Sequence, residues 1–563
     1  MLEVSNVKLS LDAGLPDGER LIRRAAVRAL GVKSAQVEEV RLLKRSVDAR
    51  KKAAGDVHFI ATLGVSLTDA SQEAALAGGR NVKAHAPYRP LEIPAVPVQA
   101  RDAEPRPIVV GTGPAGLFAA LVLARAGLRP LVLERGGDVD ERRAAVAAFD
   151  AGGPLAPTNI QFGEGGAGTF SDGKLTTNVK SPYLPHVLHW FVEAGAPEEI
   201  LWKAKPHIGT DLLVDVVRTM REQIVRAGGE VRFHAQLDGI RFEDGVAAGA
   251  RVRDCRSDAG GRAEEIPARR IVLACGHSAR DTFALLYGLG LALEQKPFSM
   301  GVRIEHLQSA IDRAQYGKAA GHPALGAADY KLAVHLPDGR GVYTFCMCPG
   351  GQVVCAASEE GGVCVNGMSR FARDGRNANS AVLVGVGPED FGSDHPLAGV
   401  ELQRRVEHAA YQAAMAAGGS PYQAPAQAVG DFLAGRPSSG PASGKRAVHP
   451  TYARGVAWCD LRDCLPAFVA DSIVQALPLF DRRLHGFADA AAVMTGVEAR
   501  SSSPVRIVRG ADYQAHLPQT PDVASGLYPC GEGAGYAGGI TSAAIDGLRV
   551  ALSLVDELAG GLC

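Results

Sequence analysis

The fold is decided by residues 106–136, which read RPIVVGTGPAGLFAALVLARAGLRPLVLERG. We expect a short apolar strand at Ile108–Val110, a helix over residues 115–126, and a second apolar strand that ends at Glu134. A G-x-G-x-x-G pattern lies between the first strand and the helix, formed by Gly111, Gly113 and Gly116. This order of strand, glycine turn, helix and strand predicts a Rossmann-like α/β unit that binds a nucleotide.

Each part of this unit has a physical role. Gly111 permits the tight turn, Gly113 lets a pyrophosphate approach the backbone, and Gly116 allows the helix to pack closely on the sheet. The N-terminus of the helix offers free N–H groups and the positive end of its dipole to the phosphates. Glu134 lies 18 residues after Gly116, where a carboxylate can accept hydrogen bonds from a ribose diol. The alternative is a glycine-rich turn in an α/β domain that binds no nucleotide.

Three further segments indicate which nucleotide is bound. Residues 158–177 (TNIQFGEGGAGTFSDGKLTT) form a polar loop with too little apolar content for a core, and such a loop can bring bare backbone against a flat ring. Residues 270–276 (RIVLACG) predict a strand that ends in glycine. Residues 526–547 (GLYPCGEGAGYAGGITSAAIDG) predict a strand, a glycine loop and a helix that begins near Ile540. Because a flavin ring lies far from its adenine, several distant segments must enclose it, and the sequence therefore predicts FAD.

The helix that begins near Ile540 has a further expected role. Its N-terminus offers N–H groups to the negative charge that reduction places on one edge of the flavin ring. Just upstream, Gly531 and Glu532 are expected to pass near the pyrophosphate. All the residues that we expect to contact FAD are Gly111, Gly113, Pro114, Ala115, Gly116, Glu134, Arg135, Gly165, Gly166, Thr169, Ser171, Lys174, Leu237, Ala274, Gly276, His277, Gly531, Glu532, Gly539, Ile540 and Thr541.

The order of these segments resembles the glutathione-reductase-type superfamily of FAD/NAD(P)-binding proteins. Five motifs, QFGEGGAGTFSDGKLTT, KPHIGTD, FCMCPGG, TGVEARSSSPVRI and CGEGAGYAGGITSAAIDG, together resemble one bacterial branch of it, the uncharacterised FAD-dependent dehydrogenases. The resemblance runs from about residue 40 to about residue 550. It implies flavin redox chemistry, and it does not name a substrate.

Composition is compatible with this interpretation. A chain of 563 residues predicts two or three domains, and its net charge of -1 gives no reason to expect a nucleic acid or an anionic membrane as partner. The N-terminal sequence MLEVSNVKLS lacks the features of a signal peptide, and the apolar runs are shorter than the ~20 residues that span a membrane. Ten cysteines in a chain of this length indicate a reducing, cytoplasmic setting, and the oligomeric state stays open.

We expect the chain to divide into five segments. Residues 1–86 alternate in the order βαββαβ, which is typical of a ferredoxin-like domain, and residues 87–107 form a proline-rich linker. Residues 108–290 form the first part of the FAD-binding domain. Residues 291–504 form an inserted substrate domain, and residues 505–563 complete the FAD-binding domain.

Three other patterns are interpreted as structural. Residues 384–392 (VGVGPEDFG) follow a strand, but acidic residues stand where a phosphate would lie, so any NAD(P)H reaches the flavin transiently or not at all. Cys346 and Cys348 alternate along a predicted strand and point to opposite faces, so we expect an ordinary buried pair and no metal site. The basic residues 44–52 (KRSVDARKK) predict a solvated edge, with an acidic partner or RNA as the alternative.

The sequence predicts a FAD-dependent oxidoreductase that moves a hydride between flavin N5 and a small organic substrate. The candidate catalytic residues are His207, His277, Tyr536 and Lys174, and Arg303 is a further candidate for orienting the substrate. Two alternatives stay open. One is a flavin-dependent monooxygenase, and the other is a flavin-bearing binding or RNA-associated module.

Overall fold

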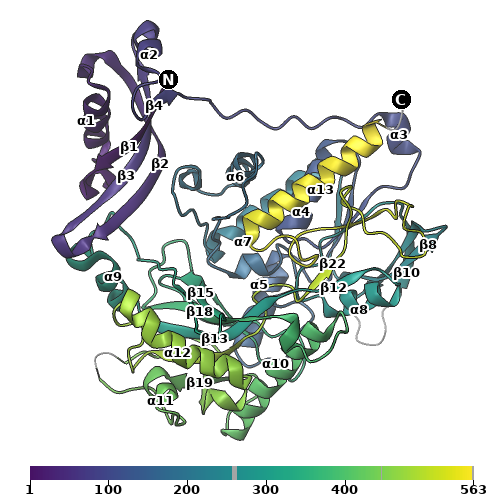
Figure 1. Cartoon of the computed structure of the whole chain (residues 1–563). Coiled ribbons are helices and arrows are strands. Elements are labelled where there is room, and N and C mark those ends of the chain that lie inside the picture. The colour runs from purple at the N-terminus through teal and green to yellow at the C-terminus, as the bar shows by residue number, and fades with distance from the viewer. Residues whose placement is uncertain (257–262, 445–446, 561–563) are drawn as a thin grey trace.

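The computed structural model describes residues 1–256, 263–444 and 447–560 and has a mixed α/β fold (Figure 1). Its N-terminal part is an antiparallel sheet of order β2-β3-β1-β4, with α1 and α2 packed against it. The elements, in chain order, are β1 (Leu2–Leu9), α1 (Glu19–Leu30), β2 (Val37–Lys51), β3 (Asp56–Leu67), α2 (Ala70–Leu76) and β4 (Val82–Ala84). Alternate residues of β3, such as Phe59, Ala61 and Leu63, form the core of this part with Ala26 and Leu30 of α1.

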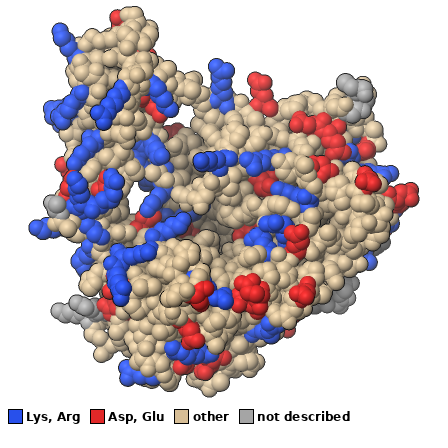
Figure 2. Space-filling model, in the orientation of Figure 1, with Lys and Arg blue, Asp and Glu red and all other residues tan. Residues whose placement is uncertain are grey.

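The N-terminal sheet contacts the main body through the basic stretch of β2 and the turn after it. The Arg45 N–H donates to the Trp202 carbonyl at 2.8 Å, and the Arg45 guanidinium lies 4.7 Å from the ring centroids of both Phe59 and Trp202. Lys52 donates to the carbonyl of Ala314. Figure 2 shows many Lys and Arg side chains over this part of the molecule. Two of the nine residues in the basic stretch therefore join the N-terminal part to the body instead of lying on a solvated edge.

An extended segment, residues 85–97, connects the N-terminal sheet to the body (Figure 1). Tyr88 fixes it to the body, because its ring stacks on His189 with centroids 3.5 Å apart and its hydroxyl lies 3.1 Å from His186 Nδ1. The short helix α3 (Val98–Asp102) follows. The sequence predicted a proline-rich linker over residues 87–107 and did not predict this helix. Pro97 is its N-cap, and no proline interrupts the helix itself.

One part of the body contains a parallel sheet of order β23-β11-β5-β6-β7. Its strands are β5 (Ile108–Val110), β6 (Leu131–Leu133), β7 (Glu230–Arg232), β11 (Ile271–Leu273) and β23 (Leu527–Pro529). Helix α4 (Pro114–Arg125) packs beside the C-terminal helix α13 (Ile540–Gly560), as Figure 1 shows. A Cβ at Gly547 of α13 would lie 2.1 Å from the Ala115 carbonyl oxygen, so glycine is required for this close approach. The two ends of the body are thus parts of one sheet and one core.

Further elements surround this sheet. The helices are α5 (Val139–Asp150), α6 (Leu184–Glu193), α7 (Thr210–Arg226) and α8 (Arg280–Gly288). An antiparallel sheet of order β10-β9-β8 lies beside them, formed by β8 (Ala235–Glu243), β9 (Val246–Asp254) and β10 (Ala263–Pro267). A two-stranded sheet links β12 (Leu293–Gln295) to β22 (Val505–Ile507), where the chain leaves and re-enters this part.

The second part of the body is built on a sheet of order β14-β15-β18-β13-β21-β19-β20. Its strands are β13 (Phe298–Leu307), β14 (Ala333–His335), β15 (Gly341–Cys348), β18 (Asn377–Val386), β19 (Ala424–Ala428), β20 (Val456–Trp458) and β21 (Val493–Glu498). The other elements are the hairpin of β16 (Gln352–Cys355) and β17 (Val365–Met368) and the helices α9 (Gln308–Tyr316), α10 (Ala398–Ala416), α11 (Val429–Leu433) and α12 (Ala467–Arg483). Nearly every residue of β13 and β18 is buried, so these strands form the core of this part.

A buried ion cluster joins the two parts of the body. Glu407 of α10 is 1% exposed and lies between Arg280, at the start of α8, and Arg500, which follows β21. Its two oxygens accept from Arg280 at 2.7 and 3.0 Å and from Arg500 at 2.7 and 2.6 Å. Burial alone would raise the pKa of Glu407, but the two guanidinium groups outweigh it and hold the pKa at about 2.

Replacing this carboxylate is expected to destabilise the protein strongly. Glu407→Gln leaves two buried guanidinium groups without their counter-charge, and breaking a buried pair in this way typically costs about 3–5 kcal/mol. Because the pKa of Glu407 is lowered on folding, its contribution is present above the pKa of an unfolded glutamate and is lost as the pH falls toward 2. Denaturant unfolding at neutral pH measures the loss. Arg404→Gln, which removes a partly exposed partner of Glu359, is the control and should cost less than about 1 kcal/mol. Equal losses in the two variants would contradict this assignment.

Candidate functional site

A cavity lies where the two parts of the body meet, with about 1540 Å³ of empty space including its solvent-open part. The glycine turn after β5 forms one end of it. Gly111 has φ of +100°, and a Cβ there would lie 2.4 Å from the Ala274 carbonyl oxygen. A Cβ at Gly116 would lie 1.9 Å from the Gly111 oxygen, whereas one at Gly113 would meet nothing closer than Gly166 Cα at 3.9 Å. Gly111 and Gly116 are therefore needed for packing, and Gly113 leaves open space on the cavity side.

Glu134, at the end of the second strand, holds three loops together. It is 5% exposed, and its carboxylate accepts four hydrogen bonds. The donors are Thr112 N at 3.0 Å, Thr112 Oγ at 2.6 Å, Gly136 N at 2.9 Å and Gly163 N at 3.0 Å. These bonds use the acceptor positions that a carboxylate offers. Glu134 also lines the cavity. Its hydrogen bonds, however, are to backbone N–H groups and to the Thr112 hydroxyl.

The polar loop of residues 158–177 is fixed by a buried arginine that the sequence did not indicate. Arg142 of α5 is fully buried and donates to backbone carbonyls along this loop. The acceptors are the carbonyls of Asn159, Ile160, Gly163, Glu164 and Gly166. Burial lowers the pKa of Arg142 to about 10, so it stays charged at neutral pH. A loop without a hydrophobic core is in this way held in one conformation along the cavity wall.

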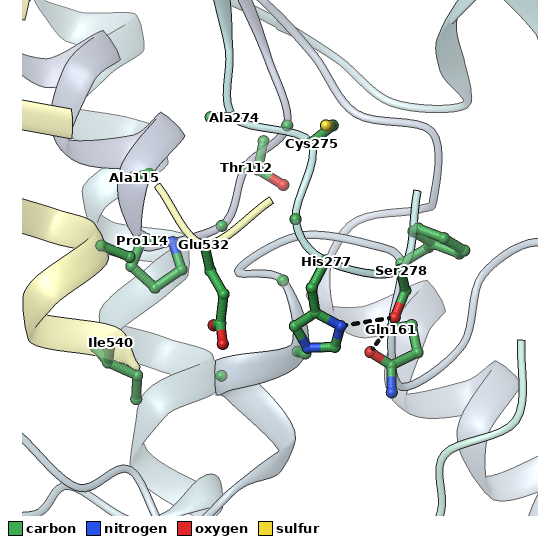
Figure 3. Close-up of a pocket in the computed structure, with 18 of the residues that line it drawn as sticks. Thr112, Pro114, Ala115, Gln161, Ala274, Cys275, His277, Ser278, Glu532 and Ile540 are labelled. Carbon is green, nitrogen blue, oxygen red and sulfur yellow. Dashed lines mark hydrogen bonds between the residues drawn. The ribbon is translucent and has the colours of Figure 1, made fainter. Parts of the chain in front are cut away.

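Two polar side chains extend side by side into the cavity from different loops, as Figure 3 shows: His277, after β11, and Glu532, after β23. His277 Nδ1 lies 3.0 Å from the hydroxyl of Ser278, which donates to Gln161 at 3.1 Å. Burial, then the charges of Arg500 and Arg280, lower the pKa of His277 to about 4. Burial raises the pKa of Glu532 to about 7. At neutral pH the imidazole is therefore uncharged, and the carboxyl group can gain or lose a proton.

The opposite wall comes from the second part of the body. It contains Phe345, Cys346, Asn366, Gly367, Glu498, Arg500 and Ser501. A β-bulge separates Phe345 from Cys348, and Cys346 has φ of +39°. Cys348 is buried, but Cys346 is exposed and lines the cavity, so the expectation of an ordinary buried pair was wrong. The bulge is the reason, because it interrupts the alternation of side chains along β15.

Arg303 lies behind this wall. It is fully buried and binds Glu498 through two hydrogen bonds of 2.6 and 3.1 Å. A Cβ at Gly367 would lie 1.8 Å from an Arg303 nitrogen, so glycine there makes room for the guanidinium. Arg303 does not itself line the cavity, whereas its partner Glu498 does. The arginine therefore supports the wall.

Most of the residues predicted for the cofactor and for catalysis line this cavity. They are Gly111, Gly113, Pro114, Ala115, Glu134, Arg135, Gly166, Ser171, Lys174, Leu237, Ala274, Gly276, His277, Glu532, Gly539 and Ile540. Five other candidates for FAD contact do not line it: Gly116, Gly165, Thr169, Gly531 and Thr541. Of these, Gly531 approaches Ala115, where a Cβ would lie 2.7 Å from the alanine methyl, and Thr541 donates to the Leu175 carbonyl at 2.9 Å. Such residues shape the wall from behind.

Two of the candidate catalytic residues lie elsewhere. His207 is buried outside the cavity wall, where its Nε2 lies 3.0 Å from the Phe371 carbonyl oxygen and its ring stacks on Phe371. Tyr536 is 37% exposed, and its hydroxyl accepts from the Arg509 N–H at 3.1 Å. The guanidinium of Arg509 also lies 3.9 Å from the Tyr536 ring centroid. Neither side chain contacts the cavity that contains His277 and Lys174.

Sequence reasoning missed Gln161, Ser278 and Arg500, which line the cavity. Gln161 and Arg500 belong to motifs that carry the family resemblance, and Ser278 follows a predicted candidate, but no local pattern assigns them a role. Within residues 1–256, 263–444 and 447–560, no group of His, Cys, Asp and Glu could hold a metal ion. In the same part of the chain, no helix is both long and apolar enough to cross a membrane.

Comparison with known proteins identifies three regions. Residues 106–148 match an FAD binding domain, residues 297–501 match the C-terminal domain-like region of FAD-dependent proteins, and residues 1–66 match a domain of unknown function. An uncharacterized protein of Clostridium beijerinckii is 42% identical over 558 residues, which cover 99% of each chain.

Solved structures with a similar chain path are more distant. A flavoprotein/dehydrogenase from Cytophaga hutchinsonii has 12% identity and a TM-score of 0.36, with 82% of this chain and 78% of that chain covered. A flavin-dependent brominase has 12% identity and a TM-score of 0.37, with 81% and 80% covered. The C. beijerinckii relative matches nearly the whole chain, and two regions of the chain match families described as FAD-binding or FAD-dependent. The chain therefore belongs, with that relative, to a family of FAD-binding flavoproteins.

Proposed function

We propose that this flavoprotein is an oxidoreductase that moves a hydride between flavin N5 and an organic substrate. The observation that supports it is the composition of the cavity. One cavity joins the open glycine turn at Gly113 to the polar residues His277 and Glu532 and to the wall formed by the second part of the body. Because its lining comes from both parts of the body, a dinucleotide held at the turn and a substrate held at the opposite wall would meet in it.

The residues at the glycine turn fit a bound FAD. The open space at Gly113 and the N-terminus of α4 suit the pyrophosphate. Gly539 and Ile540, at the N-terminus of α13, line the cavity and would face the flavin ring. Glu134 would act by holding the turn, Gly136 and Gly163 in place rather than by its own contact with the ribose.

Bound FAD supplies the two-electron acceptor or donor, and the protein supplies the groups around it. His277 would exchange a proton with the substrate. The Glu532 carboxyl group would also exchange a proton with the substrate near neutral pH, because its pKa lies at about 7. The Lys174 ammonium group, which donates to the Met347 carbonyl, would place a positive charge in the cavity wall between the two parts of the body. His207 and Tyr536 would support the fold and take no part in the chemistry.

Anaerobic reduction tests the proposal. We expect NADH or NADPH to bleach the visible absorbance of the flavin, with a rate that rises in proportion to nicotinamide concentration because the nicotinamide binds only transiently. Stopped-flow absorbance measures this rate. Rapid formation of hydrogen peroxide in air would favour monooxygenation instead. If dithionite reduces the flavin fully and neither nicotinamide does, nicotinamide is not the donor.

Gly113→Val should remove FAD without unfolding the protein. The backbone of Gly113 has φ of -66° and ψ of 177°, which any residue adopts, and the nearest protein atom to a new Cβ lies 3.9 Å away. The valine side chain would instead fill the space assigned to the pyrophosphate. Flavin absorbance per protein and circular dichroism measure the two effects. Gly288→Ala, in α8 with open space around its Cβ, is the control and should keep its FAD. Full FAD content in Gly113→Val would overturn this assignment of the turn.

Glu134→Gln should weaken FAD binding and also destabilise the protein without FAD. An amide NH2 cannot accept the hydrogen bonds that one carboxylate oxygen accepts now, and such bonds to a charged group contribute about 1.5–3 kcal/mol. We expect FAD to bind about tenfold or more weakly in a fluorescence titration, with a lower melting temperature of the apoprotein. Glu141→Gln, an exposed carboxylate nearby, is the control. A weaker affinity with an unchanged apoprotein melting temperature would show that Glu134 contacts the ribose directly.

A further inference from the structure

A chain of hydrogen bonds fixes the side chain of His277. The amide nitrogen of Gln161 donates to the Ala356 carbonyl at 3.3 Å, and the amide oxygen of Gln161 accepts from the Ser278 hydroxyl at 3.1 Å. The Ser278 oxygen lies 3.0 Å from His277 Nδ1. We call these four residues, Ala356, Gln161, Ser278 and His277, the relay. Figure 3 shows the side chains of the last three.

The relay allows one arrangement of protons. A backbone carbonyl only accepts, so the NH2 group of Gln161 must face Ala356 and its oxygen must face Ser278. The Ser278 hydroxyl has one hydrogen, and it is donated to that oxygen. The Ser278 oxygen must then accept from His277, so Nδ1 carries the ring proton and Nε2 carries a free lone pair.

This lone pair is open to the cavity. His277 is half-buried and lines the cavity, and no hydrogen-bond partner of its Nε2 occurs in the part of the chain that the structure describes. The charged groups that act on the ring are Arg500 and Arg280, which disfavour its protonation, and Glu407, which is already bound by both arginines. Glu532 extends into the cavity beside it. The ring is therefore a neutral acceptor of a proton or of a hydrogen bond.

We propose that Nε2 of His277 accepts the hydroxyl proton of an alcohol substrate while the hydrogen on its carbinol carbon leaves as a hydride, and that Ser278 and Gln161 position this base. The inference rests on the proposed function, because the hydride goes to FAD. The O–H electron pair becomes the second bond of the carbonyl product, so two electrons and one proton pass to FAD and one proton passes to Nε2. An amine would be protonated at neutral pH, and hydride cannot leave its carbon until the nitrogen has lost that proton. The relay therefore favours an alcohol and favours oxidation over carbonyl reduction. The reduced flavin would then pass its hydride to an oxidised nicotinamide, the reverse of the nicotinamide reaction that tests the proposed function.

Binding of two probes tests the proposal without electron transfer. Phenol donates a hydrogen bond, and anisole has the same ring without a donor. We expect phenol to bind the FAD-loaded protein roughly two- to tenfold more tightly than anisole, which corresponds to one net hydrogen bond. Isothermal titration calorimetry measures both affinities. His277→Phe should abolish the preference. Equal affinities in the wild type, or a preference that persists in this variant, would overturn the proposal.

A variant of Gln161 tests the positioning role of the relay while leaving the His277 side chain in place. In Gln161→Leu the Ser278 hydroxyl is released to donate to Nδ1, which moves the ring proton to Nε2, so the preference for phenol should disappear although His277 is retained. Gln475→Leu, the same change at an exposed residue of α12 outside the cavity, should keep the preference. The FAD content of each variant shows that the cavity is intact.

The ring proton can also be located directly. The ¹⁵N signals of His277 can be assigned because they are absent from the spectrum of His277→Phe. Their chemical shifts should show a protonated Nδ1 and an unprotonated Nε2 in the wild type, and the reverse in Gln161→Leu. A protonated Nε2 in the wild type would overturn the proposal even if neither probe binds. Failure of nicotinamide to reduce the flavin would instead contradict nicotinamide as the flavin's second hydride partner and leave these shifts unchanged.

Discussion

The buried carboxylate of Glu407, held between Arg280 and Arg500, is the constraint on which the cavity depends. Arg280 begins the helix that follows His277, and Arg500 precedes Ser501 in the opposite wall. One carboxylate therefore sets the distance between two walls that come from different parts of the body. Its four hydrogen bonds compensate for the loss of water around three charges, and removing it would leave two of them uncompensated.

The same cluster also acts on His277 in the cavity. Burial alone disfavours a charged imidazole, and the two arginines behind His277 act in the same direction. Glu532 extends into the same space, but its carboxyl group is kept near its midpoint of ionisation by burial. A neutral base and a carboxyl group that titrates near neutral pH thus lie together. Such pairs, whose environments move their pKa values in opposite directions, are typical of sites that transfer protons.

The sequence was most informative where a local pattern defines the structure. The structure has β5 at Ile108–Val110 and α4 from Pro114, because short-range spacing of apolar residues and glycines determines both. The role of Glu134 was less accessible. Its position after the strand predicts a carboxylate at this place, but its bond to Gly163 comes from a loop 29 residues further along the chain. His207 shows the reverse case. Its motif suggests a site residue, but the structure places its ring against Phe371, which is 164 residues away, and outside the cavity.

The residues that sequence reasoning missed share a physical property: their function comes from partners that are distant in the chain. The role of Gln161 follows only from its hydrogen bond with Ser278. The role of Arg142 follows only from its hydrogen bonds to the loop of residues 158–177. Burying such polar groups is unfavourable unless every donor finds an acceptor, and here Arg142 and Glu134 satisfy loops that have no apolar core of their own. The loops around the cavity are therefore held by the polar contacts of Arg142 and Glu134. A site held in this way is ordered before its ligands bind, and this order is what allows the direction of a single hydrogen bond, from Ser278 to Gln161, to decide which nitrogen of His277 carries the ring proton.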